Sequence, residues 1–333
     1  MVSNYTFHNR ISFQLETDDP AAQAFFQAEY ELHRGEPAPA TVRLCFHRRT
    51  PFSSIPSDYT RTHHKYLARW AYKIHITPQR IEIHAIGNRL SIPIIFHRMV
   101  LPALRMLPLE QGIAILHAAA VTYRGSSVLL TGNSGAGKTT LALLLAHTLP
   151  GVAIQADDHV FVDGSARSLP YHARMHLYDY LLPYLPFAGT ALTPIEQLRL
   201  RFWGMVHRFS RRNIKWPVRV PAQRLWNELP RTESTPIHAL VLLQRSNQSS
   251  LLLHPADPAL AAQTVQDINA REFNPFLVLC AQSLSPAERE GWLLREHALL
   301  QILTQQLPVY TLRLPTHRVD PQEIVALLSP LFN

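Results

Sequence analysis

The chain has 333 residues, of which 47% are hydrophobic and 17% charged, a balance that can fill a sizeable globular core. This length suits two domains, or one domain with a large extension. The formal net charge of +8 favours an anionic partner, and acidic peptide, nucleotide, nucleic acid and lipid head groups all qualify. Two cysteines, Cys45 and Cys280, form no spaced framework, which argues against a secreted, disulfide-stapled fold and predicts a cytoplasmic location.

Neither a membrane span nor a targeting segment is expected. Residues 1–5 show no basic segment followed by an apolar core, so they are not typical of a signal peptide. The apolar stretch 91–104 is interrupted by two prolines, a histidine and an arginine, which leaves no run long enough to cross a bilayer.

Residues 1–110 are predicted to form a strand-rich N-terminal domain that ends in a linking helix. Alternation of apolar and polar residues indicates a half-solvated antiparallel sheet. The segments with this pattern are 5–7, 11–15, 42–46, 72–76 and 81–86. Apolar residues in 94–111 then fall on one helical face, and Pro102 is expected to kink or break that helix. The domain carries no catalytic signature, and the pair His63 and His64 lacks a partner cluster for a metal.

A phosphate-binding motif organises the predicted second domain, residues 111–333. The pattern G-x-x-x-x-G-K-[ST] begins at Gly132, between an apolar strand and an apolar helix. Glycines allow backbone N–H groups to close around a phosphate, and the helix N-terminus adds partial positive charge. We expect Lys138 to reach the β- and γ-phosphates of ATP, and the Thr139 hydroxyl to help hold Mg²⁺. The predicted nucleotide-binding residues are Gly132, Asn133, Ser134, Gly135, Ala136, Gly137, Lys138, Thr139 and Thr140.

The sequence on either side of the motif indicates which class of phosphate-binding protein the chain resembles. Upstream, His117 lies in an apolar strand that a tight turn joins to the strand of the motif. Downstream, the apolar strand 152–156 ends in the carboxylate pair Asp157 and Asp158. This arrangement resembles the C-terminal catalytic domain of HPr kinase/phosphorylase and of the HPr-kinase-like serine kinases that modify peptides. In that family a histidine opens the strand pair before the phosphate-binding loop, and Ala-Asp-Asp closes the strand after it.

The resemblance is strongest over residues 113–163 and is absent before about residue 90. It implies an α/β fold with a P-loop kinase core of the HPr kinase and PEP carboxykinase-like type. It implies an ATP-dependent kinase that phosphorylates a Ser hydroxyl of a protein or peptide. It also implies that one aspartate of the pair accepts the hydroxyl proton, with Asp158 favoured, and that His117 stands beside the nucleotide.

The residues alone do not separate the two aspartates. Side chains alternate along a strand, so one carboxylate is expected to face Mg²⁺ or Lys138 and the other the acceptor hydroxyl. Two close carboxylates also push one pKa upward, which suits a general base. We predict Thr139 and Asp157 as metal ligands. The predicted catalytic set is Asp158, Asp157, His117 and Lys138.

The chain departs from the family in one segment. HPr kinase/phosphorylases carry Glu-Ile-Arg-Gly-Leu-Gly, whose Glu helps to bind metal and whose Arg region supports phosphorolysis. No such segment occurs between 164 and 235, so we expect no efficient phosphorylase activity and leave the second metal ligand unassigned. Candidates for the missing cation are Arg174, Arg211 and Arg271.

The other elements of this domain follow from weaker patterns. A short helix is expected at 175–184, and His172 and His176 would share one face of it if 171–180 is helical, without a third metal ligand. Thr193 and Pro194 are typical of a helix start. Further helices are predicted at 258–268, 286–305 and 321–328, and strands at 237–243, 249–253 and 308–314, with the second of these strands paired to the first.

A basic and aromatic belt occupies residues 199–224. Its members are Arg199, Arg201, Trp203, Arg208, Arg211, Arg212, Lys215, Trp216, Arg219 and Arg224. Interleaved Arg and Trp suit nucleic acid, phosphates or an acidic peptide, and a solvated helix face has the same pattern.

A serine kinase is the first functional hypothesis, with a protein or peptide substrate that the basic charge allows to be acidic. A small-molecule kinase on the same scaffold is the second. A nucleic-acid-linked NTPase is disfavoured because no helicase-type motif is present, and the intact Lys138, Asp157 and Asp158 argue against an inactive nucleotide-binding module. Whether the chain forms a homo-oligomer is left open.

Overall fold

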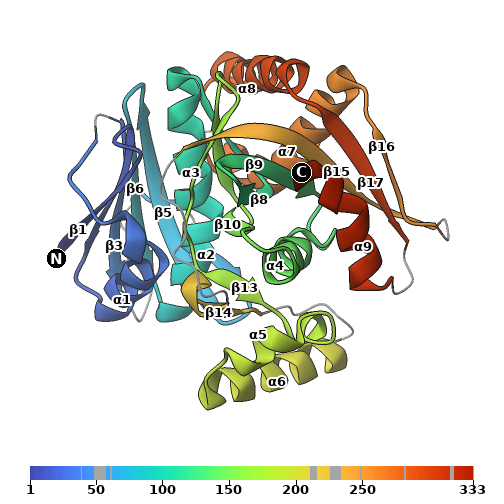
Figure 1. Cartoon of the computed structure of the whole chain (residues 1–333). Coiled ribbons are helices and arrows are strands. Elements are labelled where there is room, and N and C mark those ends of the chain that lie inside the picture. The colour runs from blue at the N-terminus through green and yellow to red at the C-terminus, as the bar shows by residue number, and fades with distance from the viewer. Residues whose placement is uncertain are drawn as a thin grey trace. The chain divides into compact units, whose positions relative to one another are not determined.

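The computed structural model describes residues 1–38, 40–48, 58–60, 62–210, 216–225, 234–247, 250–280, 283–315 and 319–332. They form two compact units (Figure 1): unit 1 comprises residues 1–114 and 269–299, and unit 2 comprises 115–268 and 300–333. Both units combine helices with a mixed sheet, which confirms the predicted α/β class. The predicted boundary near residue 110 lies close to the end of the first segment of unit 1. That unit also takes in 269–299, which were predicted to belong to the C-terminal domain.

Unit 1 contains a six-stranded sheet in the order β1-β2-β3-β6-β5-β4. The strands are β1 (Val2–Phe7), β2 (Ile11–Thr17), β3 (Ala40–Arg48), β4 (His63–Lys65), β5 (Ala68–Thr77) and β6 (Arg80–Gly87). The five predicted strands are confirmed. The expected antiparallel arrangement is wrong in part, because β3 runs parallel to both β2 and β6.

The helix α1 (Pro20–Glu29) explains this parallel pairing, because it carries the chain back across the sheet between β2 and β3. The sequence marks the start of α1 with a capping residue and a proline. The side chain of Asp19 accepts hydrogen bonds from the backbone N–H groups of Ala21 and Ala22, and Pro20 occupies the first helical position.

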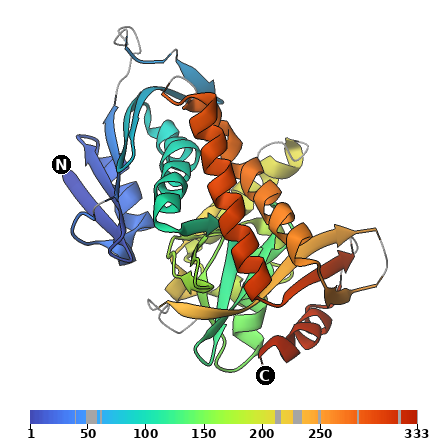
Figure 2. The same cartoon turned by 90° about the horizontal axis from the view of Figure 1, so that it is seen from above.

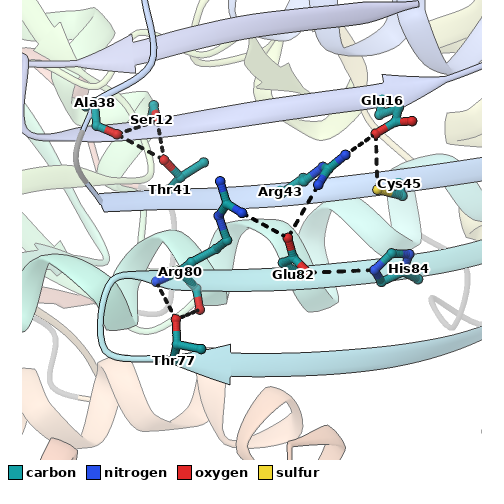
Figure 3. Close-up of polar contacts among 10 residues, drawn as sticks. All are labelled: Ser12, Glu16, Ala38, Thr41, Arg43, Cys45, Thr77, Arg80, Glu82 and His84. Atoms are coloured by element: carbon teal, nitrogen blue, oxygen red, sulfur yellow. Dashed lines mark hydrogen bonds and ion pairs between the residues drawn. The ribbon is translucent and has the colours of Figure 1, made fainter.

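The two faces of this sheet differ in polarity. On one face, Phe13 packs against Phe26 and Tyr30, with ring centroids 5.0 and 5.6 Å away. On the other face, Arg43 of β3 pairs with Glu16 of β2 and Glu82 of β6, so that a ladder of charges crosses three strands (Figure 3). This division of faces is the physical origin of the alternation seen in the sequence.

A helical segment from Arg89 to Gln111 follows β6, as predicted. It consists of α2 (Ile92–Ile95), a π-turn (Phe96–Val100) and α3 (Leu101–Met106), with 3₁₀ turns at both ends. No break occurs at Pro102, because the π-turn just before it accommodates the missing N–H group and the bulk of the ring. Among the described residues this is the one helix long and apolar enough to cross a membrane, and 72% of its apolar window is buried inside the structure.

Unit 2 is organised around a nine-stranded sheet. One path through it runs β10-β8-β9-β15-β12-β11-β7, with β17 beside β15 and β16 beside β17 (Figure 2). The strands are β7 (Ile113–Leu116), β8 (Ala118–Tyr123), β9 (Ser126–Gly132), β10 (Ala153–Ala156), β11 (Val160–Asp163), β12 (Arg167–Leu169), β15 (Thr235–Ser246), β16 (Leu252–Pro255) and β17 (Val309–Pro315). Because β9, β15 and β17 are parallel, their carboxyl ends meet at one edge of the sheet.

The helices agree with most predictions. They are α4 (Lys138–Thr148), α5 (Pro186–Thr190), α6 (Pro194–Phe209), α7 (Pro258–Leu279), α8 (Pro286–Gln306) and α9 (Pro321–Leu328). Figure 1 shows α4 and α9 next to each other, and α4 packs on β8 and β9. Five buried residues in a row, 141–145, make α4 apolar on all sides, as expected for a helix enclosed by its unit.

Two local predictions in unit 2 are wrong. Residues 175–184 do not begin as a helix: β13 (Met175–Leu177) pairs with β14 (Val218–Val220), and a 3₁₀ turn follows, so His172 and His176 are not helical neighbours. The strand β16 pairs with β17 rather than with β15. The reason is that β9 and β17 already occupy the two edges of β15 over residues 240–243.

Candidate functional site

The glycine-rich loop between β9 and α4 has a backbone that only glycine adopts readily. Gly135 and Gly137 have φ values of 80° and 111°, in the left-handed region. At Gly132 a Cβ atom would lie 2.8 Å from the carbonyl oxygen of Leu243 on β15, so the close approach of the two strands also requires glycine. The loop therefore places the first N–H groups of α4 at the carboxyl edge of the sheet, where anions bind.

Lys138, the first residue of α4, is buried and folds back over this loop. Its Nζ atom donates hydrogen bonds to the carbonyl oxygens of Gly132 at 2.9 Å and Asn133 at 3.4 Å. It also lies 2.8 Å from Nε2 of His117, which is buried at the junction of β7 and β8. The hydroxyl of Thr131 donates to the carbonyl oxygen of His117 and holds this junction against β9.

The contact with Lys138 determines which nitrogen of His117 carries a proton. A lysine ammonium only donates, so Nε2 must accept and a neutral ring is protonated on Nδ1. Burial is the main cause that lowers the pKa of His117 to about 3; Lys138 and His159 lower it further and Asp158 opposes them. The neutral ring thus carries its proton on Nδ1, the nitrogen that lies 3.5 Å from Oδ1 of Asp158.

The aspartate pair divides between two sets of partners. Asp157 Oδ1 accepts a hydrogen bond of 2.8 Å from the hydroxyl of Thr139, in the first turn of α4. Asp158 instead lies between two imidazoles, with His117 Nδ1 at 3.5 Å and His159 Nδ1 at 3.9 Å from its oxygens. The predicted set of Lys138, Thr139, His117 and both aspartates is therefore brought together, and the two aspartates face different neighbours.

A γ-turn produces this division. The N–H of His159 donates to the carbonyl oxygen of Asp157 at 2.8 Å, and Asp158 at the apex has φ of 67°. A non-glycine residue in this region costs of order 1–3 kcal/mol and is concentrated at functional sites. The strain turns the side chain of Asp158 out of the alternation of β10 and toward the histidines.

The two carboxyl groups also differ in the direction of their pKa shifts. Burial, followed by the charge of Asp158, raises the pKa of Asp157 to about 7. Burial also raises the pKa of Asp158, but His117, His159 and Lys138 lower it by more, so the net pKa lies well below the ordinary value. The upward shift expected for the base thus falls on Asp157, because three nitrogen-bearing side chains surround Asp158.

The β13–β14 ribbon adds residues that the sequence analysis did not combine. Its apolar side chains, Met175, Leu177, Val218 and Val220, are buried in the core. The cross-strand pair His176 and Arg219 lies on the other face. Burial and Arg219 lower the pKa of His176 to about 4, with Asp158 acting in the opposite direction.

Tyr178 follows on the same alternation as His176. Burial raises its pKa, with smaller contributions from Tyr180 and Asp158. His176 and Tyr178 are therefore near enough to Asp158 to interact with it electrostatically, and Arg219 acts on both of them. A helix was predicted for this segment, but the period-two spacing of Arg174, His176 and Tyr178 is the sequence signal that favours a strand.

A cation beside the glycine-rich loop was also missed. Arg245 lies near the end of β15, and its Nη2 atom is 3.7 Å from the place of a Cβ atom on Gly137. Its Nη1 atom donates to the carbonyl oxygen of Pro315 at 3.1 Å, which anchors the guanidinium at the carboxyl edge of the sheet. Of the cations predicted for this role, Arg174 precedes β13, Arg271 is in α7 within unit 1, and Arg211 lies outside the described residues.

Oxygen and nitrogen ligands for a metal occur in two places. Thr139 and Asp157 offer two oxygens, the ligand type that Mg²⁺ prefers. His117, Asp158 and His159 each offer one ligand atom, all within 4.8 Å of one another. While Lys138 donates to Nε2, however, Nδ1 of His117 carries the proton and has no lone pair for a cation. The oxygen pair is therefore the better fit for Mg²⁺.

The members of the basic belt that the structure describes do not all share one role. Arg224 donates to Glu196 and to the carbonyl oxygen of Ala191, which anchors the start of α6. Arg208 pairs with Asp179 at 3.2 Å. Trp203 and Trp216 are half-buried and stack on each other with centroids 5.5 Å apart. Arg211, Arg212 and Lys215 lie outside the described residues.

No protein-family model matches this chain, and no curated protein matches it.

Proposed function

We propose that the chain is an ATP-dependent kinase that transfers the γ-phosphate to a Ser hydroxyl of a protein or peptide. The observation that carries the proposal is the division of the aspartate pair. Asp157 accepts from the hydroxyl of Thr139, whereas Asp158 faces His117, which in turn contacts Lys138. Phosphoryl transfer requires a phosphate cradle, a metal, a proton acceptor and cations, and one loop and its neighbours supply candidates for all four.

The phosphate cradle and the metal ligands come from the loop and the first turn of α4. The triphosphate would take the backbone N–H groups of 133–139, and Lys138 would exchange its carbonyl contacts for phosphate oxygens. Thr139 and Asp157 would hold Mg²⁺, which supplies charge neutralisation on the β- and γ-phosphates. Because a raised pKa leaves part of Asp157 protonated near pH 7, this carboxyl loses a proton when it becomes a ligand.

Asp158 is the proposed proton acceptor. The serine oxygen forms a bond to the γ-phosphorus, the bond from that phosphorus to the β–γ bridging oxygen breaks, and ADP keeps the electron pair. The hydroxyl proton passes to a carboxylate oxygen of Asp158. In a loose transition state the proton leaves late, so an ionised carboxylate in the right place is sufficient. Side-chain exposure of 36% leaves Asp158 accessible to a substrate hydroxyl.

Besides Lys138, two arginines are candidates to stabilise the charge of the transferring group. Arg245 is anchored beside Gly137, and Arg219 lies on the ribbon whose polar side chains interact with Asp158. We assign Arg245 to the nucleotide phosphates and Arg219 to the acceptor side. Replacement of Arg245 by Gln should raise the KM for ATP, and Arg245→Lys should restore part of the loss because it keeps the charge.

The proposal excludes efficient phosphorolysis, because the segment associated with it in HPr kinase/phosphorylases is missing from 164–235. It also disfavours nucleic acid as the partner. Trp203 and Trp216 stack on each other rather than presenting flat faces for bases, and Arg208 and Arg224 pair with acidic side chains.

The test is phosphate transfer by the full-length chain to a library of Ser peptides, each with a Ser→Ala twin. ADP release and mass spectrometry should show phosphate on the Ser peptide only, and Asp158→Asn should abolish it. Incubation of the phosphopeptide with inorganic phosphate should release no pyrophosphate. Hydrolysis of ATP stimulated by single-stranded nucleic acid, without transfer to any peptide, would sink the proposal. Transfer to a free small-molecule alcohol alone would replace it with the second hypothesis.

A further inference from the structure

The helix α6 presents two apolar faces, and within the described part of the unit only one of them is buried. Leu200 and Gly204 face inward, where a Cβ atom on Gly204 would lie 2.2 Å from Oδ2 of Asp179. On the outward face, large apolar side chains are between 48% and 83% exposed. They are Ile195, Leu198, Phe202, Met205 and Phe209. Figure 1 shows α5 and α6 as the lowest layer of the view.

The spacing of the outward residues follows a heptad repeat. The intervals from Ile195 to Phe209 are three, four, three and four residues, which places Ile195, Phe202 and Phe209 at position a and Leu198 and Met205 at position d. A stripe restricted to a and d is the narrow seam of a coiled coil rather than the broader face of a helix packed on a core.

Arginines flank this seam on both sides. In the same register Arg199 occupies position e, and Arg201 and Arg208 occupy position g. All three are exposed, and Arg208 also pairs with Asp179. Side chains at e and g choose the partner of a coiled coil by their charge. A complementary helix therefore carries Asp or Glu at these positions.

The helix is held in place without a partner. Thr193 and Glu196 form a capping box at its start, and Arg224 binds Glu196 from outside the helix. A seam on a preformed helix about 24 Å long loses little conformational entropy on binding. The exposed stripe thus belongs to a fixed surface.

We propose that the outward face of α6 is a docking site for an amphipathic helix of another protein, with apolar residues at a and d and acidic residues at e and g. A second copy of this chain is a poor occupant, because pairing two such faces brings arginine against arginine. An anionic bilayer is also a poorer match, because membrane-surface helices bury a broad apolar face. This inference rests on α6 alone and does not depend on the proposed kinase activity.

The test uses the full-length chain and a synthetic 21-residue peptide with Leu at a and d and Glu at e and g. A twin peptide with Lys at e and g is the control. Fluorescence anisotropy should show at least tenfold tighter binding of the Glu peptide. Phe202→Glu in the protein should weaken that binding at least tenfold, whereas Leu260→Glu, at a similarly exposed leucine of α7, should leave it unchanged. Circular dichroism and the thermal melting midpoint should be the same for both variants.

A charge reversal sharpens the test. The double variant Arg201→Glu and Arg208→Glu should prefer the Lys peptide. Equal binding of both peptides, or binding of neither, would overturn the proposal. So would a dimer in sedimentation that Phe202→Glu dissolves, or binding to phosphatidylglycerol vesicles that Phe202→Glu abolishes while the Glu peptide does not compete. Loss of kinase activity in every assay would leave these results unaffected.

Discussion

The Nζ atom of Lys138 lies 2.8 Å from Nε2 of His117, and Nδ1 of the same ring lies 3.5 Å from Oδ1 of Asp158. One imidazole therefore connects the lysine of the glycine-rich loop to the proposed base. The lysine can only donate, so the ring carries its proton on Nδ1, the nitrogen nearer Asp158, as long as this contact persists. If a phosphate draws Lys138 away, Nε2 of His117 can accept a hydrogen bond from another donor. Asp158 then also loses a nearby positive charge.

The two nitrogens of His117 can be tested separately. In His117→Asn the amide lies close to the position of Nδ1 and can still donate to Asp158. In His117→Gln the amide lies closer to the position of Nε2 and serves Lys138. We expect Asn to retain about tenfold more turnover than Gln, a smaller effect than the roughly 10²–10⁴-fold that a general base itself contributes. Steady-state kinetics measures this, and equal losses would show that only the ring volume matters.

Substitutions in the loop should separate metal binding from folding. Lys138→Ala should abolish transfer, and Thr139→Ala should weaken Mg²⁺-dependent nucleotide binding. Thr139→Ser is the matched control, because it keeps the hydroxyl that donates to Asp157. Calorimetry with Mg·ATP, paired with thermal melting, provides the readout. Unchanged affinity in Lys138→Ala and Thr139→Ala would remove the nucleotide assignment.

Substitutions of the two aspartates should have different kinetic effects. Asp158→Asn should lower kcat by roughly 10²–10⁴ with ATP affinity largely kept, the usual effect of losing a general base. Asn also tolerates the positive φ at this position. Asp157→Asn should instead shift the Mg²⁺ concentration needed for half-maximal rate. If neither variant slows turnover by about tenfold, short of that range, the carboxylates have a structural role only.

His176 predicts a pH dependence of stability. Its pKa is lowered to about 4 in the folded chain, from an ordinary value of about 6.5. Between these values the unfolded chain binds a proton that the folded chain does not, so the free energy of unfolding rises with pH from 4 to 6.5 and falls on acidification. His176→Gln should reduce this slope by up to about 1.4 kcal/mol per pH unit. Urea titrations at several pH values test this, with the exposed His238→Gln as control; identical slopes in both variants would contradict it.

Unit 1 contains a buried ion pair whose disruption should be costly. Arg105 of α3 donates to Glu296 of α8 at 2.8 Å and to the carbonyl oxygen of Asn269 at 3.2 Å. Arg105→Met should lower the free energy of unfolding by about 3–5 kcal/mol, because Glu296 is left buried without its countercharge.

Two further variants give this prediction its controls. The double variant Arg105→Met with Glu296→Leu should recover much of the loss. In the half-exposed ladder of unit 1, Arg43→Met should cost only about 0–1 kcal/mol. Equal losses for Arg43→Met and Arg105→Met in urea titrations would show that burial of the pair does not matter.

Local patterns were sufficient for most elements and for bringing Lys138, Thr139, His117 and the two aspartates into one predicted set. Alternation identified five of the six strands in the sheet of unit 1 and did not identify β4. Glycines and flanking apolar runs identified the loop at 132–137, and Thr193 with Pro194 marked the start of α6. These features depend on neighbours within a few residues, such as a cap, a turn or one face of a strand, and sequence contains that information directly.

The tertiary structure decided what depends on distant segments. Asp157 and Asp158 differ in their partners because of the γ-turn, the hydroxyl of Thr139 and the ring of His117. His117 lies 40 positions before Asp157 in the sequence. Arg245 reaches Gly137 because β15 runs parallel to β9. His176 interacts electrostatically with Asp158 in a segment, 175–177, that pairs with β14 instead of forming a helix. Strand pairing depends on contacts between residues far apart in the sequence. These contacts must offset the entropy cost of closing the loop between them, and a local sequence pattern contains no information about them.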